Sequence, residues 1–191
     1  MDRTLKAALI SLVFNIAFGA YHLVLGVVSG SWWLFTLGSY YFILSIVRFT
    51  VLRVKERERF VAIFTGRMLM ILTVPLVGTV VLSVVRDRGY ELHMIIMIAM
   101  AAYAFTKITL ATVDLIKSRR STSVTLVALR NISFADAFVS IFALQRSMLV
   151  SFEGMTDGEI RMMNAVIGFA VCVIVFLLGL HLTKRKYQNE D

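Results

Sequence analysis

The chain has 191 residues, of which 59% are hydrophobic and only 17% are charged, and its mean hydropathy is +0.81. Soluble domains average roughly 45–50% apolar and about 25% charged residues, so this composition excludes an intrinsically disordered chain and leaves too few polar side chains to cover a water-soluble core. The single cysteine, Cys172, excludes an intramolecular disulfide, and the net charge of +8 has to be explained by topology or by an anionic partner.

Six apolar stretches long enough to cross the hydrocarbon core of a bilayer follow one another along the chain. They cover residues 5–28, 32–52, 68–85, 92–116, 124–150 and 160–182. No segment shows the period-two alternation of a barrel strand. The first stretch is too long for a signal peptide and has no small-residue cleavage site, so we expect it to be retained. The sequence therefore predicts a single all-α domain, 1–191, of a polytopic membrane protein with six transmembrane helices.

The basic residues are distributed unevenly over the connections between these stretches. Fifteen of the 20 Lys and Arg residues fall in the two tails and in or beside the second and fourth loops, whereas four fall on the opposite side. Because cytoplasmic loops carry an excess of Lys and Arg, we expect both termini in the cytoplasm and a multi-pass protein of the inner (plasma) membrane. The clusters 53–59 and 184–186 could also capture anionic lipid headgroups, although Glu56 and Glu58 dilute the first of them.

Neither catalysis nor nucleic-acid binding is indicated by a motif. The sequence has no metalloprotease helix motif, no nucleophile elbow and no phosphate loop, and no two histidines have metal-ligand spacing. No basic region interleaved with aromatic residues lies outside the apolar stretches. We therefore expect no enzyme activity, no cofactor and no bound metal. The expected partner is the lipid bilayer rather than a nucleic acid, and a homodimer stays open.

Two charged residues lie far from either end of their predicted spans. On a rise of 1.5 Å per residue, Lys107 and Asp136 are both roughly 15–18 Å from the cytoplasmic ends of spans four and five. Charges at this depth are costly and usually face the interior of the bundle, where a pair neutralises both groups. We therefore expect Lys107 and Asp136 to contact each other, either as a functional pair or as a structural tie between two helices.

Further polar residues of the spans separate into two groups by depth. The candidates for a polar centre are Asp136, Lys107, Tyr40, Asn15 and Asn131. Nearer the cytoplasm, we expect a shallower charge cluster of Arg48, Asp114 and Arg130. All of them could instead be interhelical glue, since hydrogen bonds between membrane helices contribute about 0.6 kcal/mol each on average.

Spans one, two and five contain a pattern of polar and small residues. Its members are Asn15, Gly26 and the pair Gly30-Ser31 in the first two spans, and Asp136 with Ser140 beyond it in the fifth. These stretches resemble the cation diffusion facilitator (cation efflux) family, which often carries an Asn, then a Gly, then a Gly-Ser before its second helix. Six spans with both termini inside also fit this family, although the resemblance covers only a minor part of the chain.

The transport site of that family takes two ligands from its second helix and two from its fifth. The corresponding positions here are Tyr40, Leu44, Ile132 and Asp136. Only Asp136 is a credible ligand, because a zinc site needs three or four N, O or S donors. The resemblance thus implies a degenerate relative that lacks most metal ligands, in which Tyr40 and Lys107 fill the place of the metal.

Two functions remain open from the sequence. The first is a small transporter-like protein for protons, monovalent cations or a small solute, with Asp136 and Lys107 as a switching pair at mid-depth. The alternative is a non-transporting scaffold or lipid-interacting subunit in which the same pair is fixed. Hydration discriminates them, since a water-filled cleft that reaches Asp136 would favour transport.

Overall fold

The computed structural model describes residues 3–54, 57–85, 94–118, 123–151 and 155–184. Within these ranges every regular element is an α-helix, which confirms the all-α prediction for them. The helices are, in chain order, α1 (Arg3–Ser29), α2 (Trp32–Arg53), α3 (Glu58–Val85), α4 (Met94–Ser118), α5 (Val124–Ser151) and α6 (Asp157–Lys184). Parts of the two basic clusters, at 55–56 and 185–186, lie outside the described residues.

The connection between α1 and α2 is a tight turn of two residues. Gly30 has a φ of 64°, in the left-handed region that glycine adopts without steric penalty. The amide of Ser31 donates to the carbonyl of Gly26 at 2.9 Å and that of Gly30 to Val27 at 3.4 Å, which is the Schellman pattern of a helix end. Ser31 Oγ also accepts from the amide of Leu34 at 3.4 Å and caps α2. The end of α1 and the beginning of α2 are therefore held close together by this turn.

The helices α3 and α6 begin three or more residues earlier than the apolar stretches predict. α3 begins at Glu58 rather than at the start of 68–85, because hydropathy finds the apolar part of a helix and not its first turn. The Glu58 carboxylate lies in that first turn, where the helix dipole favours a negative charge. α6 starts with a capping box, in which the Thr156 amide donates to the Glu159 carboxylate at 2.8 Å and the Glu159 amide donates to Thr156 Oγ1 at 3.4 Å.

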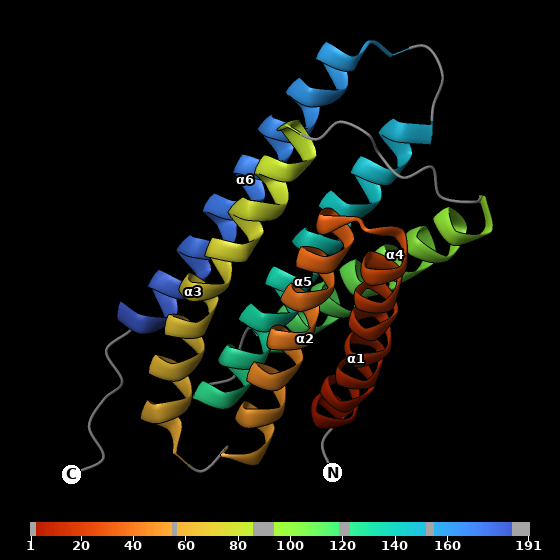
Figure 1. The fold of residues 1–191 in the computed structure, drawn as a ribbon. Helices are drawn as coiled ribbons and strands as arrows, with labels where there is room; N and C mark the ends of the chain where they lie inside the picture. Colours follow the sequence, from red (N-terminus) through yellow and green to blue (C-terminus); the bar gives the residue numbers. More distant parts are fainter. Residues whose placement is uncertain (1–2, 55–56, 86–93, 119–122, 152–154, 185–191) are drawn as a thin grey trace.

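The axes of α1, α2, α3, α5 and α6 follow a common direction, whereas α4 is inclined to them (Figure 1). α1 packs on α2, α3 packs on α6, and α5 is the most buried of the long apolar helices. α4 packs mainly on α5 and also touches α1. The beginning of α1 and the end of α6 lie at the same end of the bundle, together with the end of α2 and the beginnings of α3 and α5 (Figure 1).

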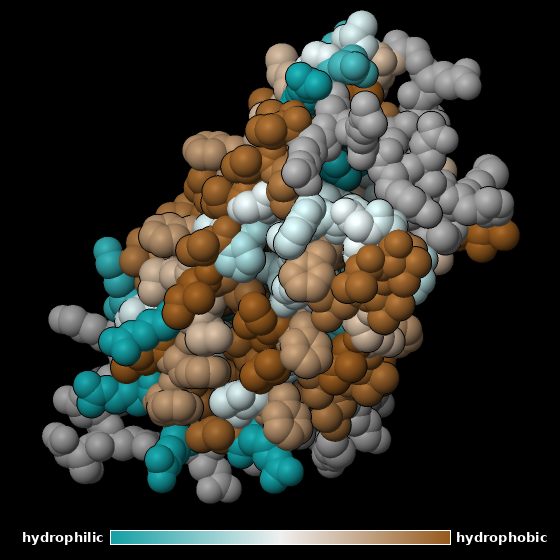
Figure 2. Space-filling view, viewed as in Figure 1, coloured by the Kyte–Doolittle hydropathy of each residue, from teal (hydrophilic) through white to brown (hydrophobic). Residues whose placement is uncertain are grey.

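The outer surface of the bundle is apolar. α1, α2, α3, α5 and α6 are long and apolar enough to cross a membrane, and α4 contains the shorter apolar stretch Met97–Val113. Large hydrophobic side chains such as Val28, Val74 and Phe169 are exposed. Figure 2 shows hydrophobic residues over the middle of one face and the most hydrophilic ones toward its two ends. The fold is consistent with a small helical membrane protein, because apolar side chains on the outside of such a bundle face lipid rather than water.

Glycines allow the two close helix pairs to approach backbone to backbone. A Cβ added at Gly66 on α3 would lie 2.7 Å from the carbonyl oxygen of Gly179 on α6. A Cβ added at Gly38 on α2 would lie 2.7 Å from the backbone nitrogen of Leu23 on α1. Small residues at such positions are typical of membrane helix interfaces, because association there depends on van der Waals packing rather than on the hydrophobic effect.

Candidate functional site

Asp136, on the buried helix α5, is the centre of a charged cluster. Its side chain is 0% exposed, and three donors from three other helices converge on its Oδ2 atom. Asn15 Nδ2 on α1 donates at 2.8 Å, Lys107 Nζ on α4 at 2.5 Å and Arg48 Nη2 on α2 at 3.3 Å. The structure therefore brings Lys107 and Asp136 together, as their equal depth indicates, and adds a second cation.

The ammonium group of Lys107 uses all of its hydrogen-bond donors. Besides Asp136, it donates to Ser11 Oγ at 2.9 Å and to Asn15 Oδ1. Asn15 Oδ1 also accepts from the hydroxyl of Tyr103 at 2.7 Å, and the Tyr103 ring centroid lies 5.1 Å from Lys107 Nζ. An ammonium group has three donors, so Lys107 is saturated by its neighbours.

Arg48 is placed differently from its expected position in the shallow cluster. Its guanidinium group is 0% exposed and reaches Asp136, and Nη2 also donates to Ser133 Oγ at 3.4 Å. The depth estimate was made at the Cα atom, whereas helical side chains lean toward the helix N-terminus and arginine is long. α2 runs toward the end of the bundle where the chain begins, so this lean carries the Arg48 side chain away from that end and toward Asp136 (Figure 1).

The other two members of the predicted shallow cluster, Arg130 and Asp114, are only partly described by the structure. Arg130 is half-buried on α5, and the side chain of Asp114 on α4 lies outside the part of the chain that the structure describes. Tyr40 and Asn131 are both buried, at 0% and 4% exposure, but neither forms a hydrogen bond with Asp136 in the described part of the structure. Of the predicted polar centre, the structure therefore joins Asp136, Lys107 and Asn15.

Charge and hydrogen bonding are not balanced within the Arg48–Lys107–Asp136 cluster. Two cationic groups face one carboxylate, so the cluster carries one positive charge in excess if all three groups are ionised. Among the described residues, Arg48 Nε and Nη1, Asp136 Oδ1 and the hydroxyl of Tyr40 have no hydrogen-bond partner. A buried polar atom left in this way costs about 1–3 kcal/mol, and a charged one costs more. Lys107 is therefore the saturated cation and Arg48 the unsaturated one.

An aromatic layer borders the cluster on α1, α2 and α4. The rings of Phe18 and Tyr103 stack with centroids 3.9 Å apart, and Phe18 meets Tyr41 edge to face at 5.4 Å. Ser140 Oγ donates to the Asp136 carbonyl at 2.8 Å, so the Tyr41 hydroxyl is the donor in its 3.0 Å contact with Ser140. These contacts hold the Tyr41 side chain against α5 one turn after Asp136.

Some contacts of the cluster were missed by reasoning from the sequence. Ser11 and Ser133 each contact a charged member, and neither was singled out. Their spacing carries the signal, because Ser11 precedes Asn15 by four residues and Ser133 precedes Asp136 by three, which puts each serine on the same helix face as its neighbour.

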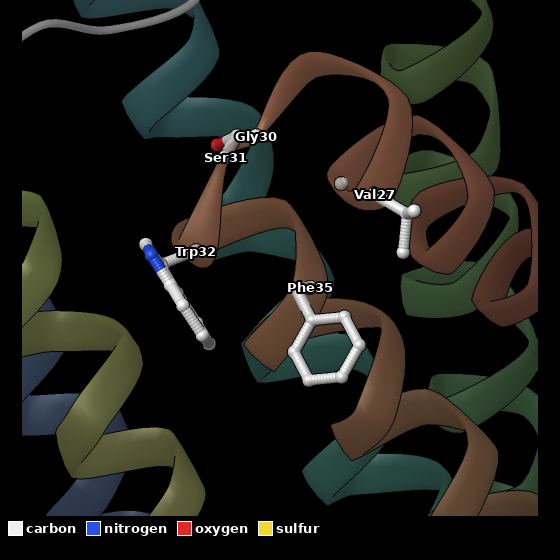
Figure 3. Close-up of a pocket in the computed structure, with 6 residues that line it drawn as sticks. Val27, Gly30, Ser31, Trp32 and Phe35 are labelled. Atoms are coloured by element: carbon white, nitrogen blue, oxygen red, sulfur yellow. The ribbon is translucent and has the colours of Figure 1, made fainter.

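Two hollows on the surface lie away from the cluster. Figure 3 shows residues that line the first, of about 280 Å³, at the α1–α2 turn: Val27, Gly30, Ser31, Trp32 and Phe35. The second, of about 470 Å³, is an apolar groove between α3 and α6. No residue that contacts Asp136 lines either hollow.

Among the described residues, no three His, Cys, Asp or Glu side chains gather as a metal-binding group would require. His22, for example, is buried, and its Nδ1 lies 2.8 Å from the carbonyl oxygen of Phe18. No protein-family model, no curated protein and no solved structure matches the chain.

Proposed function

We propose that the protein is a small, transporter-like protein of the plasma membrane in which the cluster around Asp136 moves or binds a small solute. The observation that carries this proposal is the convergence of Arg48 and Lys107 on Asp136 inside an apolar bundle. Ionisable groups within the membrane layer are costly and typically mark substrate or ion pathways. The sequence-based candidates were protons, monovalent cations and small solutes, and an excess of positive charge disfavours a cation among them.

The proposed topology has six spans with both termini in the cytoplasm. The proposal counts α4 as a span in addition to the five long apolar helices, even though the apolar stretch of α4, Met97–Val113, is the shortest. The uneven distribution of Lys and Arg supports this orientation, as does the position of the beginning of α1 and the end of α6 at one end of the bundle (Figure 1). The bilayer is the only partner that the proposal requires.

Lys107 is the element of the cluster that we expect to move. It sits on the inclined helix α4, which packs on α5 and only touches α1. A displacement of α4 would separate Lys107 from Asp136 while Arg48, on α2, stays in contact with the carboxylate. Such a change of partners is a two-state device of the kind that transporters use.

A relationship to the cation diffusion facilitator family belongs to this proposal. The positions that correspond to its metal ligands, Tyr40, Leu44, Ile132 and Asp136, are all fully buried on α2 and α5. In a degenerate relative, the Lys107 ammonium would supply the positive charge that a metal ion supplies elsewhere. The burial of these four side chains supports the correspondence, and an apolar Leu44 and Ile132 agree with the loss of the metal.

The scaffold function is favoured by one specific observation. The ammonium group of Lys107 is saturated with hydrogen bonds to described residues. If the cluster only ties α1, α2, α4 and α5 together, it has no need of water or of a solute.

Accessibility of Ser140 to aqueous reagents separates the two functions. In a Cys172→Ser background, Ser140→Cys places a thiol beside Asp136. Val175→Cys places a similarly buried thiol on α6, a helix with no described hydrogen bond to the Asp136 side chain. For a transporter, we expect a membrane-impermeant methanethiosulfonate to modify Ser140→Cys but not Val175→Cys in liposomes. Asp136→Asn should abolish flux of protons, potassium or acetate in the same liposomes. Equal protection of both thiols together with no flux would establish the scaffold.

A further inference from the structure

The charge of the Arg48–Lys107–Asp136 cluster is one positive unit too high for a dry interior. Asp136 is the only described acidic side chain in contact with either cation. Arg48 and Asp136 are 0% exposed and Lys107 is 4% exposed, so water contributes little to their solvation. A charge in a low-dielectric region requires a counter-charge, which the described side chains do not provide.

Arg48 has the free donors to receive that counter-charge. Its Nη2 serves Asp136 and Ser133, whereas Nε and Nη1, which carry three N–H bonds, have no partner among the described residues. Lys107 has no such capacity, because its three donors are already used.

A second unpartnered donor lies on the same helix. The hydroxyl of Tyr40 is fully buried without a hydrogen bond in the described structure, and Tyr40 precedes Arg48 by eight residues, about two turns of α2. Residues eight apart fall on similar faces of a helix. Tyr40 and Arg48 thus offer a hydroxyl and a guanidinium group from one side of α2 to the interior of the bundle.

From these observations we infer that Arg48, with Tyr40, binds a monovalent anion of the halide or carboxylate class. One negative charge balances the single positive charge in excess, whereas a divalent anion would leave the cluster with a net negative charge. Guanidinium groups are weakly hydrated and match carboxylates well, so they are suited to a buried anion site. If the bound anion is also the transported solute, this inference rests on the proposed function. Binding of the anion itself does not require transport.

Binding of chloride to the purified protein in detergent micelles provides the test. ³⁵Cl line broadening should be saturable in the wild type and should be reversed by acetate but not by sulfate. Arg48→Gln should weaken chloride binding at least about tenfold, which is the effect of losing a charge-assisted hydrogen bond. Arg53→Gln removes the same charge from an exposed position on the same helix and should leave binding unchanged.

The change in chloride affinity caused by Asp136→Asn distinguishes an anion site from a cation site. This substitution removes the carboxylate that competes for Arg48, so an anion site should bind chloride about tenfold more tightly. A cation site would lose its ligand instead. Asp157→Asn, at an exposed position in the first turn of α6, removes the same charge and should have no effect. Tyr40→Phe should weaken binding while preserving the shape of the side chain, which also covers the case in which Arg48→Gln fails to fold. The inference is overturned if wild type shows no saturable broadening, if sulfate competes like acetate, or if Asp136→Asn leaves chloride binding unchanged or weaker.

Flux measurements on the same preparations separate the two proposals. Chloride binding without flux of chloride or acetate in proteoliposomes would refute transport and leave the anion site intact. Flux of protons or potassium without chloride binding would support transport and refute the anion site.

Discussion

Replacing the two partners of the Lys107–Asp136 contact should have very unequal effects on stability. Asp136→Asn leaves Arg48 and Lys107 facing each other without a carboxylate, and removal of one partner of a buried ion pair costs about 3–5 kcal/mol. Lys107→Met keeps most of the apolar stem and leaves Arg48 and Asp136 as a neutral pair.

The magnitude for Lys107→Met follows from two opposing effects. The lost contact with Asp136 is a charge-assisted hydrogen bond, worth about 1.5–3 kcal/mol. The ammonium group, however, no longer has to be desolvated, and that penalty is several kcal/mol per ion in a protein interior. Asn15 Oδ1 keeps the hydroxyl of Tyr103 as a donor at 2.7 Å. We therefore expect Lys107→Met to change the free energy of unfolding by less than about 1 kcal/mol.

Reversible unfolding by SDS in mixed micelles measures this difference directly. Lys184→Met, at the exposed end of α6, controls for the loss of a surface charge. The double variant Asp136→Asn/Lys107→Met restores the net charge of the wild-type cluster, so it should be more stable than Asp136→Asn alone by about 1–3 kcal/mol. Equal destabilisation by Lys107→Met and Asp136→Asn, with no rescue in the double variant, would refute the reasoning from excess charge.

Three further predictions concern other contacts of the bundle. Gly66→Ala should destabilise the protein by about 1–3 kcal/mol because its Cβ would meet the Gly179 backbone, whereas Gly78→Ala, which meets nothing within 4 Å, should be neutral or slightly stabilising in the same SDS titration. Tyr103→Phe removes the 2.7 Å hydrogen bond to Asn15 and should cost about 0.6–1.7 kcal/mol by the same measure; a cost as large as that of Asp136→Asn would contradict it. Thr156→Ala removes the cap of α6 and should lower stability by about 0.5–2 kcal/mol, with faster amide exchange confined to the first turn of that helix; protection equal to wild type there would show that the capping box contributes nothing.

The helices could be predicted from the sequence because each has a long apolar run, but their ends could not. α3 extends back to Glu58, since a helix continues as long as its backbone hydrogen bonds are satisfied, whether or not its surface is apolar. The inclination of α4 could not be predicted either, because crossing angles between helices depend on which side chains interlock and not on hydropathy.

The cluster around Asp136 was partly predictable for a physical reason. Lys107 and Asp136 lie at equal depth, and unpaired charges at that depth are too costly, so the pair follows from counting residues along two helices. Arg48 was assigned to another cluster because the count was made along the backbone, whereas the position of its charge depends on the length and lean of the side chain. Hydrogen bonds of small residues such as Ser11 depend on packing that no single sequence displays.

The two-residue turn at Gly30 has a mechanical consequence for the whole bundle. With such a short link and a close backbone approach at Gly38, α1 and α2 form one tightly joined hairpin. Asn15 and Arg48 lie on the two helices of this hairpin, and both donate to the Asp136 carboxylate, whereas Lys107 donates to it from α4. A movement of α4 relative to this hairpin would therefore change the contact of Lys107 with Asp136 separately from that of Arg48.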